Sequence, residues 1–229
     1  MATTPDWLQL LVADTVPETL LQRVRAYRRG RQFSKAGVTM VHVPRSAGTS
    51  LAASIYGTFL GHFTLKDLLS VSPARILALP RFTVVRNPWS RAVSAWSFAR
   101  AGGGLEPVGE LRVRIAHPER YQGSEFTSFE RYVDEWLARQ PLERLDGVFR
   151  LQADYVLDRN GTLAFDHVGR FEQLPETIAW LSDRLDRKLA PPHANRSEVA
   201  DYRSHYTPYL RDRVAAIYAR DIELLGYNF

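Results

Sequence analysis

The segment at residues 42–51 combines residue types that bind anions at a turn between two elements. The backbone can approach a ligand closely at Gly48, and Thr49 and Ser50 offer hydroxyl donors. Arg45 adds a permanent positive charge with a forked set of N–H donors. If a strand ends before this turn and a helix begins after it, backbone N–H groups and the positive end of the helix dipole point at the same place. The segment therefore predicts a phosphate cradle.

A second segment at residues 82–96 has the same character. A run of strand-forming residues ends at Arg86, and Pro88 then favours the first turn of a helix. Ligands of open α/β sheets bind at the carboxyl ends of the strands, which is where Arg86 is placed. Ser94 follows two turns into the helix, near the side that carries Ser90 and Arg91. Two anion sites on two strands imply a ligand with two separated phosphates.

The first segment differs from the loop that binds nucleoside triphosphates. That loop needs a lysine directly after its last glycine and then a Ser or Thr that holds magnesium. Here Thr49 stands in the lysine position, and the basic residue, Arg45, precedes Gly48. The loop is thus suited to a 5′-phosphate without apparatus for β- and γ-phosphates. A small-molecule kinase remains as an alternative.

The elements that position these residues follow from hydrophobic periodicity. We expect an amphipathic helix at 5–29, strands at 38–43 and 81–85, and helices from 48 to about 60, from 88 to about 100, and at 126–139, 174–185 and 207–225. We also expect a short strand at 62–65, helix at 66–79 with a break near Pro73, and a turn at Asn160–Gly161 between residues 148–157 and 163–171. Thr49 or Ser50 is the expected N-cap of the helix after the first turn. The alternation of strands and helices predicts an α/β fold with a central, mostly parallel sheet, in a single domain spanning 1–229 with a helical extension at 1–35.

Composition limits the classes of function. The 229 residues are 45% hydrophobic and carry a net charge of +5 with a pI near 9.6, which suits an anionic ligand but does not by itself indicate nucleic acid or membrane binding. Because the chain has no cysteine, it has neither a thiolate zinc site nor a cysteine nucleophile. No apolar run is long enough to span a bilayer, and we see no signal peptide at the N-terminus, so a cytoplasmic protein is expected.

The two anion segments together closely resemble the two donor-binding motifs of sulfotransferases that use 3′-phosphoadenosine-5′-phosphosulfate (PAPS). The likeness is strongest to the carbohydrate branch, of heparan, chondroitin and HNK-1 type, and its bacterial relatives. Weaker likeness continues through residues 171–172, 193–197 and 218–227. The resemblance implies a P-loop-like, three-layer fold. It also implies transfer of a sulfuryl group from PAPS to an acceptor hydroxyl, on a glycan or another small molecule, without a metal.

The resemblance assigns roles to individual residues. The 5′-phosphosulfate would contact residues 45–50, and the 3′-phosphate would contact Arg86 and Ser94. The residues predicted to bind the donor are Arg45, Ser46, Ala47, Gly48, Thr49, Ser50, Arg86 and Ser94. The family usually has lysine where this chain has Arg45, and that lysine neutralises the departing phosphate. Arginine supplies charge but is a far poorer proton donor, so this departure concerns catalysis more than binding.

A general base must accept the proton of the acceptor hydroxyl, and His62 is the candidate. It follows the helix that begins at the anion loop, and related carbohydrate sulfotransferases are similar in placing a histidine on the strand after that helix. The rivals are His42, His117, His167 and His193, or a carboxylate. His42 is expected to be structural.

Other features leave alternatives open. Trp89 and Trp96 are more often core residues than stacking platforms for adenine or a sugar. The glycine-rich start of residues 101–125 suggests a movable wall of the acceptor site. The arginine-rich segment at 23–31 is either a solvated helix end or a strip that docks an acidic partner. A non-catalytic module that binds polyanions is the remaining alternative to an enzyme.

Overall fold

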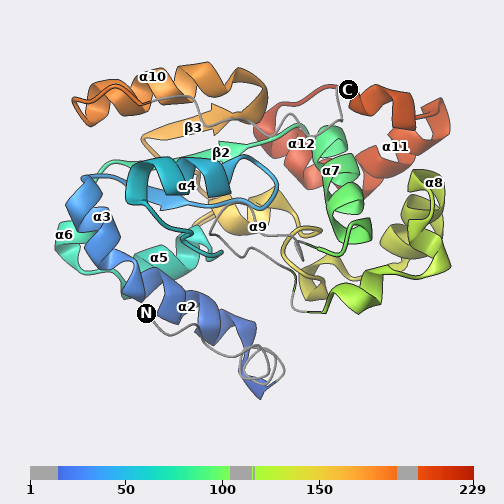
Figure 1. Ribbon diagram of the computed structural model, residues 1–229, viewed down its shortest axis with the longest axis horizontal. Coiled ribbons are helices and arrows are strands. Elements are labelled where there is room, and N and C mark those ends of the chain that lie inside the picture. The colour runs from blue at the N-terminus through green and yellow to red at the C-terminus, as the bar shows by residue number, and fades with distance from the viewer. Residues whose placement is uncertain (1–14, 104–114, 116, 190–200) are drawn as a thin grey trace.

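The computed structural model describes residues 15–103, 115, 117–189 and 201–229 (Figure 1). The N-terminal part begins with α2 (Glu18–Arg28), preceded by Pro17, and continues in α3 (Gly30–Ala36). The helix expected from residue 5 is therefore described only from its second half, and residues 1–14 lie outside the described part. Gly37, with φ of 77°, ends α3 in the left-handed conformation and leads the chain into the first strand.

The sheet consists of three short parallel strands, β1 (Thr39–Val41), β2 (Arg81–Val85) and β3 (His167–Arg170), in the order β1-β2-β3. Met40 pairs with Phe82, and Thr83 pairs with Val168. The two strands that precede the anion segments are adjacent, so their carboxyl ends meet at one edge. The predicted parallel α/β fold is confirmed.

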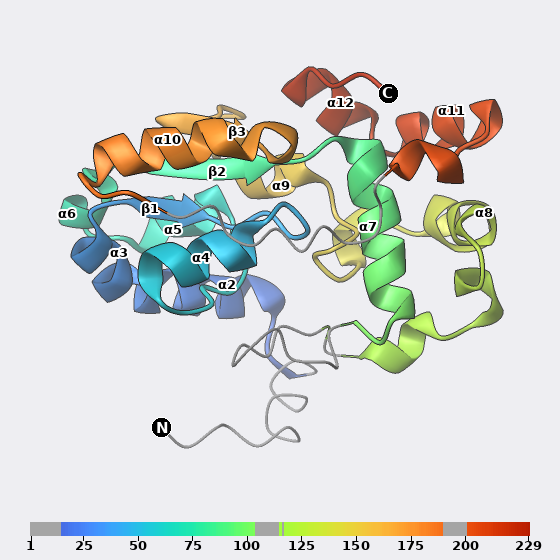
Figure 2. The ribbon, with the colours of Figure 1, turned by 45° about the horizontal axis from the view of Figure 1, so that its top comes forward.

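Helices cover both faces of this sheet. Figure 2 shows α4 (Gly48–Tyr56) and α10 (Leu174–Arg184) on one face, and α5 (Leu65–Val71) and α9 (Gln152–Val156) on the other. The short α6 (Ala74–Leu77) follows α5 after Pro73, where the break was expected. Beyond the end of β2, α7 (Pro88–Arg100), α8 (Phe129–Arg131) and α11 (Pro208–Ile217) form a helical part of their own, and α12 (Ala219–Leu225) follows (Figure 2).

Several of the predicted strands and helices differ from those in the structure. Residues 62–65 do not form a strand, because Thr64 and Asp67 make a capping box that starts α5 at Leu65. The helix expected at 126–139 is divided into α8, a π-helical turn (Tyr132–Trp136) and a 3₁₀ turn (Leu137–Arg139). In the π turn Tyr132 stacks on Trp136 with ring centroids 5.6 Å apart, so aromatic packing accompanies the loss of regular helix. The expected closing helix at 207–225 is likewise two helices, joined at the buried Tyr218.

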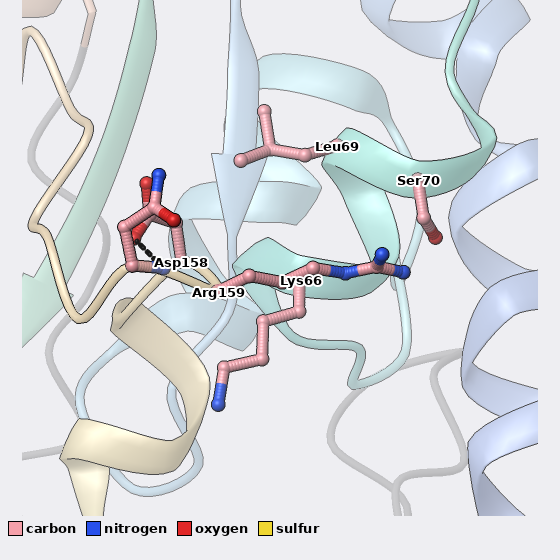
Figure 3. Close-up of a pocket in the computed structure, with 6 residues that line it drawn as sticks. Lys66, Leu69, Ser70, Asp158 and Arg159 are labelled. Carbon is pink, nitrogen blue, oxygen red and sulfur yellow. Dashed lines mark hydrogen bonds between the residues drawn. The ribbon is translucent and has the colours of Figure 1, made fainter.

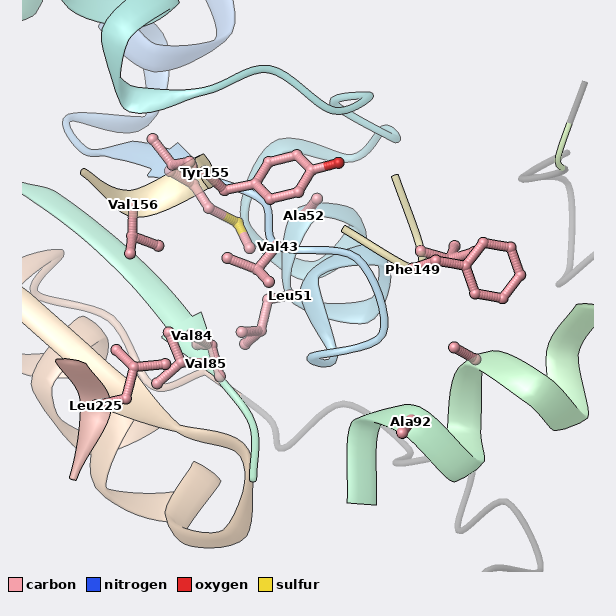
Figure 4. Packing of buried hydrophobic residues seen from close by; sticks show 14 of the residues in the cluster. Val43, Leu51, Ala52, Val84, Val85, Ala92, Phe149, Tyr155, Val156 and Leu225 are labelled. Atoms are coloured by element: carbon pink, nitrogen blue, oxygen red, sulfur yellow. The ribbon is translucent and has the colours of Figure 1, made fainter. Parts of the chain in front are cut away.

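Part of the hydrophobic core surrounds the edge where β1 and β2 end. Figure 4 shows Val84 and Val85 of β2 and Leu51 of α4 among its buried side chains. Val156 of α9 and Leu225 of α12 come from elements far away in the sequence. The ends of the two strands are thus supported by both helical layers and by the C-terminal helix.

Candidate active site

The loop between β1 and α4 has an unusual backbone. Arg45 and Ala47 have φ of 68° and 61°, in the left-handed region that non-glycine residues rarely occupy. Ala47 precedes α4 without any side-chain cap, and the amide of Leu51 bonds to its carbonyl at 3.1 Å. The expectation that Thr49 or Ser50 caps this helix is therefore wrong, since both lie within its first turn. A left-handed residue followed by a helical one makes a concave nest of N–H groups, which leaves the amides at the start of α4 available to an anion.

Two buried polar atoms in this loop have no protein partner. The Ser46 hydroxyl is completely buried and the Nδ1 atom of His42 nearly so, and neither makes a hydrogen bond within the described residues. Burying a hydroxyl without a partner costs free energy, which a ligand oxygen would recover. The His42 ring also lies against Gly48, where an added Cβ would come within 1.8 Å of it. This contact inside the protein is enough to require glycine at position 48.

The second anion segment meets the first. The Arg86 Nε donates to the hydroxyl of Ser90 at 3.0 Å, and its Nη1 donates to the carbonyl of Arg45 at 3.2 Å. The Nε of Arg45 donates to the Ser94 hydroxyl at 3.1 Å, which joins the loop to α7. These hydrogen bonds thus form one cluster from residues that are separated by 41 and 49 positions in the sequence.

Aromatic rings support both of these guanidinium groups. The Arg45 guanidinium lies 4.4 Å from the centroid of the Phe98 ring, and that of Arg86 lies 4.2 Å from Phe171. Such contacts hold a planar guanidinium in one orientation while leaving its edge N–H groups open.

The electrostatics of the cluster favour an anion. Burial, with the charges of Arg86 and Arg91, lowers the pKa of Arg45 to about 10. Burial lowers the pKa of Arg86 to about 10 as well, although Glu172 partly opposes this. Both remain charged at neutral pH, and Glu172 is the nearby carboxylate that most favours the charged form of Arg86. A ligand with several negative charges would relieve this repulsion.

His62 lies behind the loop, in the coil between α4 and α5. Its Nδ1 is 3.2 Å from the carbonyl of His42, and since a carbonyl only accepts, Nδ1 carries the hydrogen and Nε2 carries the lone pair. Burial lowers the pKa of His62 to about 4, a shift to which Arg25 and Arg91 add and which the bond to His42 opposes. The side chain is therefore neutral at pH 7.

The segment that carries His62 is attached to α2. Arg29 donates to the carbonyl of Leu60 at 2.9 Å, and Arg25 donates to the carbonyl of His62 at 3.5 Å. These contacts give part of the arginine-rich segment a structural role. Within the described residues, no hydrogen bond joins His62 to Arg45, whose side chain lies on α7 instead. The two predicted catalytic side chains are thus not joined by a hydrogen bond in the structure.

The other histidines and the tryptophans lie as follows. His42 is buried directly after β1, in agreement with a structural role. His167 lies on β3 against Thr177, and His117 contacts Glu119. His193 lies outside the described residues, as do residues 104–114 and 116 of the suggested acceptor wall. Trp89 and Trp96 are buried and donate to backbone carbonyls, which confirms them as core residues.

Arg91 has a structural role at this site that the sequence does not predict, since the sequence places it only near Ser94 on the same helix. It is 2% exposed, and its guanidinium donates to the carbonyls of Pro44 at 3.0 Å, Arg150 at 2.8 Å and Gly147 at 3.4 Å. It therefore ties the anion loop to α7 and to the segment before α9. A second arginine five positions after Arg86 indicates a further positive charge near the site. The sequence does not indicate its hydrogen-bond acceptors, because these are backbone carbonyls.

A hollow of about 330 Å³ lies between α5 and the turn after α9, and Figure 3 shows Lys66, Leu69, Ser70, Asp158 and Arg159 around it. Asp158 accepts from the amides of Asn160 and Thr162 and so forms the turn expected at Asn160–Gly161. None of the predicted donor-binding residues lines this hollow. We assign it no part in the site.

Comparison with known proteins decides the family. The model of the sulfotransferase family matches residues 34–228, which is most of the chain. This chain belongs to the sulfotransferase family. No curated protein and no solved structure matches it. The protein is accordingly a sulfotransferase, an enzyme that transfers a sulfuryl group to an acceptor.

Among the residues that the structure describes, no helix combines the length and the apolar character needed to span a bilayer. The same residues contain no group of three or more His, Cys, Asp or Glu side chains arranged to hold a metal ion.

Proposed function

We propose that the enzyme transfers the sulfuryl group from PAPS to a hydroxyl of a carbohydrate or glycoconjugate. The observation that carries the donor assignment is the junction of the two anion segments, where Arg45 and Arg86 converge from adjacent strands and the buried Ser46 hydroxyl lacks a partner. A ligand with a 5′-phosphosulfate and a separate 3′-phosphate matches this positive, two-part site. The carbohydrate acceptor rests on the resemblance of residues 42–51 and 85–96 to the carbohydrate branch, and a cytoplasmic location stays a prediction.

The chain offers a suitable set of groups for such a donor. The amides of residues 46–50, the hydroxyls of this loop and the guanidinium of Arg45 would hold the 5′-phosphosulfate. Arg86 and Ser94 would hold the 3′-phosphate. Several charge-assisted hydrogen bonds to each phosphate give the high affinity that a small, highly charged nucleotide needs.

PAPS supplies a sulfuryl group already activated by a phosphate leaving group, so the residues mainly position and stabilise charge. We assign Arg45 to the negative charge that develops on the leaving phosphate as the bond between sulfur and oxygen breaks. We assign the Nε2 lone pair of His62 to the proton released as the acceptor oxygen bonds to sulfur. A pKa near 4 keeps His62 ready to accept a proton at neutral pH but makes it a weak base.

Calorimetry with adenosine 3′,5′-bisphosphate tests the donor site. We expect tight binding by the wild type and a loss of about a hundredfold in Arg86→Ala, because a charge-assisted contact to the 3′-phosphate disappears. Arg159→Ala, at the hollow of Figure 3, is the matched control and should bind normally. A thermal shift with magnesium and ATP but none with the bisphosphate would favour a kinase. Binding only to polyanions with a steep salt dependence would favour a non-catalytic module.

Tests of the acceptor and of the general base require measurements of turnover. A screen of sugars, lipid headgroups, phenols and tyrosine peptides with labelled PAPS identifies the acceptor class, and the proposal expects a sugar hydroxyl. With that acceptor, His62→Ala should lower the single-turnover rate by about a hundredfold or more while donor affinity is kept. A near-normal rate would remove His62 as the base.

A further inference from the structure

Residues from distant parts of the chain converge on the backbone at Arg86 and Asn87, directly beyond the end of β2. The amide of Asn87 donates to the carboxylate of Glu172 at 2.8 Å, which also accepts from the hydroxyl of Tyr227. The Phe171 ring lies under the Arg86 guanidinium. The point where the predicted 3′-phosphate arginine leaves the sheet is therefore held from several sides.

Gln152 makes the most specific of these contacts. The last pair between β2 and β3 joins Val85 to Arg170, so the backbone groups of Arg86 have no strand partner in this ladder. The side-chain amide of Gln152 takes that place: the Arg86 N–H donates to Oε1 at 2.9 Å, and Nε2 donates to the Arg86 carbonyl at 2.7 Å. Gln152 is completely buried, and a primary amide is the neutral side chain that can pair with both groups at once.

The position of Gln152 is itself set by the C-terminal part of the chain. It is the first residue of α9, and its amide N–H donates to a carboxylate oxygen of Asp221 at 2.8 Å. The other carboxylate oxygen accepts from the amide of Ala153 at 2.9 Å. Asp221 is fully buried on α12. A chain of contacts therefore runs from α12 through the start of α9 to the backbone of Arg86.

The remaining contacts of Arg86 show why its backbone matters. Its Nε bonds to Ser90 and its Nη1 to the carbonyl of Arg45, which leaves Nη2 without a hydrogen bond among the described residues. A guanidinium held this way can meet a phosphate in one orientation, and a shift of the backbone by part of an ångström would misalign it. Contacts of this kind lose much of their strength with small displacements.

We propose that Gln152 is a positioning residue, which holds Arg86 in the orientation that recognises the 3′-phosphate of the donor. This inference rests on the proposed function, because it takes Arg86 as the 3′-phosphate ligand. Gln152 contributes to donor selectivity without touching the donor. Its effect should fall mainly on the 3′-phosphate, since Gln152 bonds to the backbone of Arg86 and makes no hydrogen bond of its own to residues 45–50, which it reaches only through the bond from Arg86 to the Arg45 carbonyl.

The experiment compares two nucleotides in calorimetry, adenosine 3′,5′-bisphosphate and adenosine 5′-monophosphate, which lacks the 3′-phosphate. We expect the wild type to prefer the bisphosphate by about a hundredfold, as charge-assisted contacts to a phosphate allow. In Gln152→Met, which keeps the length of the side chain but not its hydrogen bonds, that preference should fall by about tenfold. Affinity for the monophosphate should stay within about twofold of the wild-type value.

The control is Thr177→Val. Thr177 is also fully buried, and its hydroxyl lies 3.0 Å from His167 Nε2, away from Arg86. This variant should lose thermal stability without changing the preference. Gln152→Glu is the second variant if Gln152→Met does not fold: it keeps the acceptor for the Arg86 N–H and loses the donor, and its preference should also fall.

The outcomes separate this inference from the proposed function. If Gln152→Met or Gln152→Glu folds and keeps the full preference, or loses affinity equally for both nucleotides, the positioning role is wrong. If the wild type itself does not prefer the bisphosphate, the donor assignment fails, whatever the Gln152 variants do.

Discussion

The two strand-to-helix junctions of the site differ in how they satisfy their own polar groups. After β1, α4 starts without a side-chain cap, Arg45 and Ala47 take left-handed backbone conformations, and the buried Ser46 hydroxyl has no partner. After β2, the Asn87 side chain caps α7 by accepting from the amides of Trp89 and Ser90, at 3.0 and 3.3 Å.

The difference shows which junction depends on a ligand. The second junction is satisfied by the protein, with Pro88 in the first turn of α7 and Asn87 held by Glu172 and by the Asn228 carbonyl. The first junction leaves the N–H groups at the start of α4 without a side-chain cap and a buried hydroxyl without a partner, which costs stability in the free protein and is recovered on binding an anion. We therefore expect removal of an unpaired group at the first junction to act on binding, and loss of the Asn87 cap at the second to act on folding.

The largest effect is expected for Gly48→Ala. A Cβ there would lie 1.8 Å from the His42 ring, which is buried and cannot move freely. We expect a loss of about 3 kcal/mol of unfolding free energy, measured by urea denaturation, because overpacking forces the loop to shift. Binding of adenosine 3′,5′-bisphosphate should be lost as well.

A second substitution tests this cause. In the background of His42→Ala, which removes the ring, Gly48→Ala should destabilise the protein by less than about 1 kcal/mol, because contacting residues show non-additive effects. An additive result would mean that the clash with His42 is not the reason for glycine at this position.

The next effect is a pH dependence of stability that comes from His42 at the first junction and from His62, whose ring lies beside it. Burial lowers the pKa of His62 to about 4 and that of His42 well below 6.5. Between pH 4 and 6.5 the unfolded chain therefore binds more protons than the folded one, so stability falls as the pH falls. The contribution of the neutral histidines to stability is fully present above pH 6.5. Of the stability lost on acidification, His62 accounts for at most about 3 kcal/mol.

Urea denaturation of the wild type and of His62→Gln at pH 8, 6 and 4.5 measures this contribution. The difference in unfolding free energy between the two proteins at pH 8 gives the effect of the substitution when His62 is neutral. As the pH falls, the variant should lose less stability than the wild type. Parallel curves for the two proteins would contradict the lowered pKa of His62.

A smaller effect is expected for Ser46→Ala. The hydroxyl has no partner in the protein, so its removal should leave the unfolding free energy unchanged or slightly higher. Affinity for adenosine 3′,5′-bisphosphate and for adenosine 5′-monophosphate should each fall by about tenfold, because both contain the 5′-phosphate. Lower stability with normal affinity would show that Ser46 belongs to the fold and not to the donor site.

The smallest effect is expected for Asn87→Ala, at the second junction. Loss of the cap should lower the unfolding free energy by about 1 kcal/mol. Thr207→Ala is the matched control, because Thr207 caps α11 by accepting from the amide of Leu210 at 3.2 Å. Equal losses in the two variants would show that Asn87 acts as an ordinary cap, whereas a much larger loss would mean that its contacts with Glu172 and Asn228 dominate.

Local sequence determined a large part of the fold and the location of the site. Strand propensity at 38–43 and 81–85 and the proline at position 88 predicted the elements that flank both anion segments, and the structure confirms these elements. Helix continuity was predicted less well. The pattern at 126–139 fits one helix, but the stacking of Tyr132 on Trp136 accompanies a π turn there. Packing of that kind depends on partners outside the window in which periodicity is read.

The residue types and spacing at 42–51 and 82–96 were enough to predict an anion site, because backbone geometry after a strand depends on a few neighbouring residues. They were not enough to predict the missing cap of α4 or the contact between His42 and Gly48. The roles of Arg91 and Gln152 were also beyond local reasoning, since each bonds to backbone groups that lie 47 to 66 residues away. Backbone N–H and C=O groups are the same at every residue, so only the tertiary structure decides which buried side chain satisfies them.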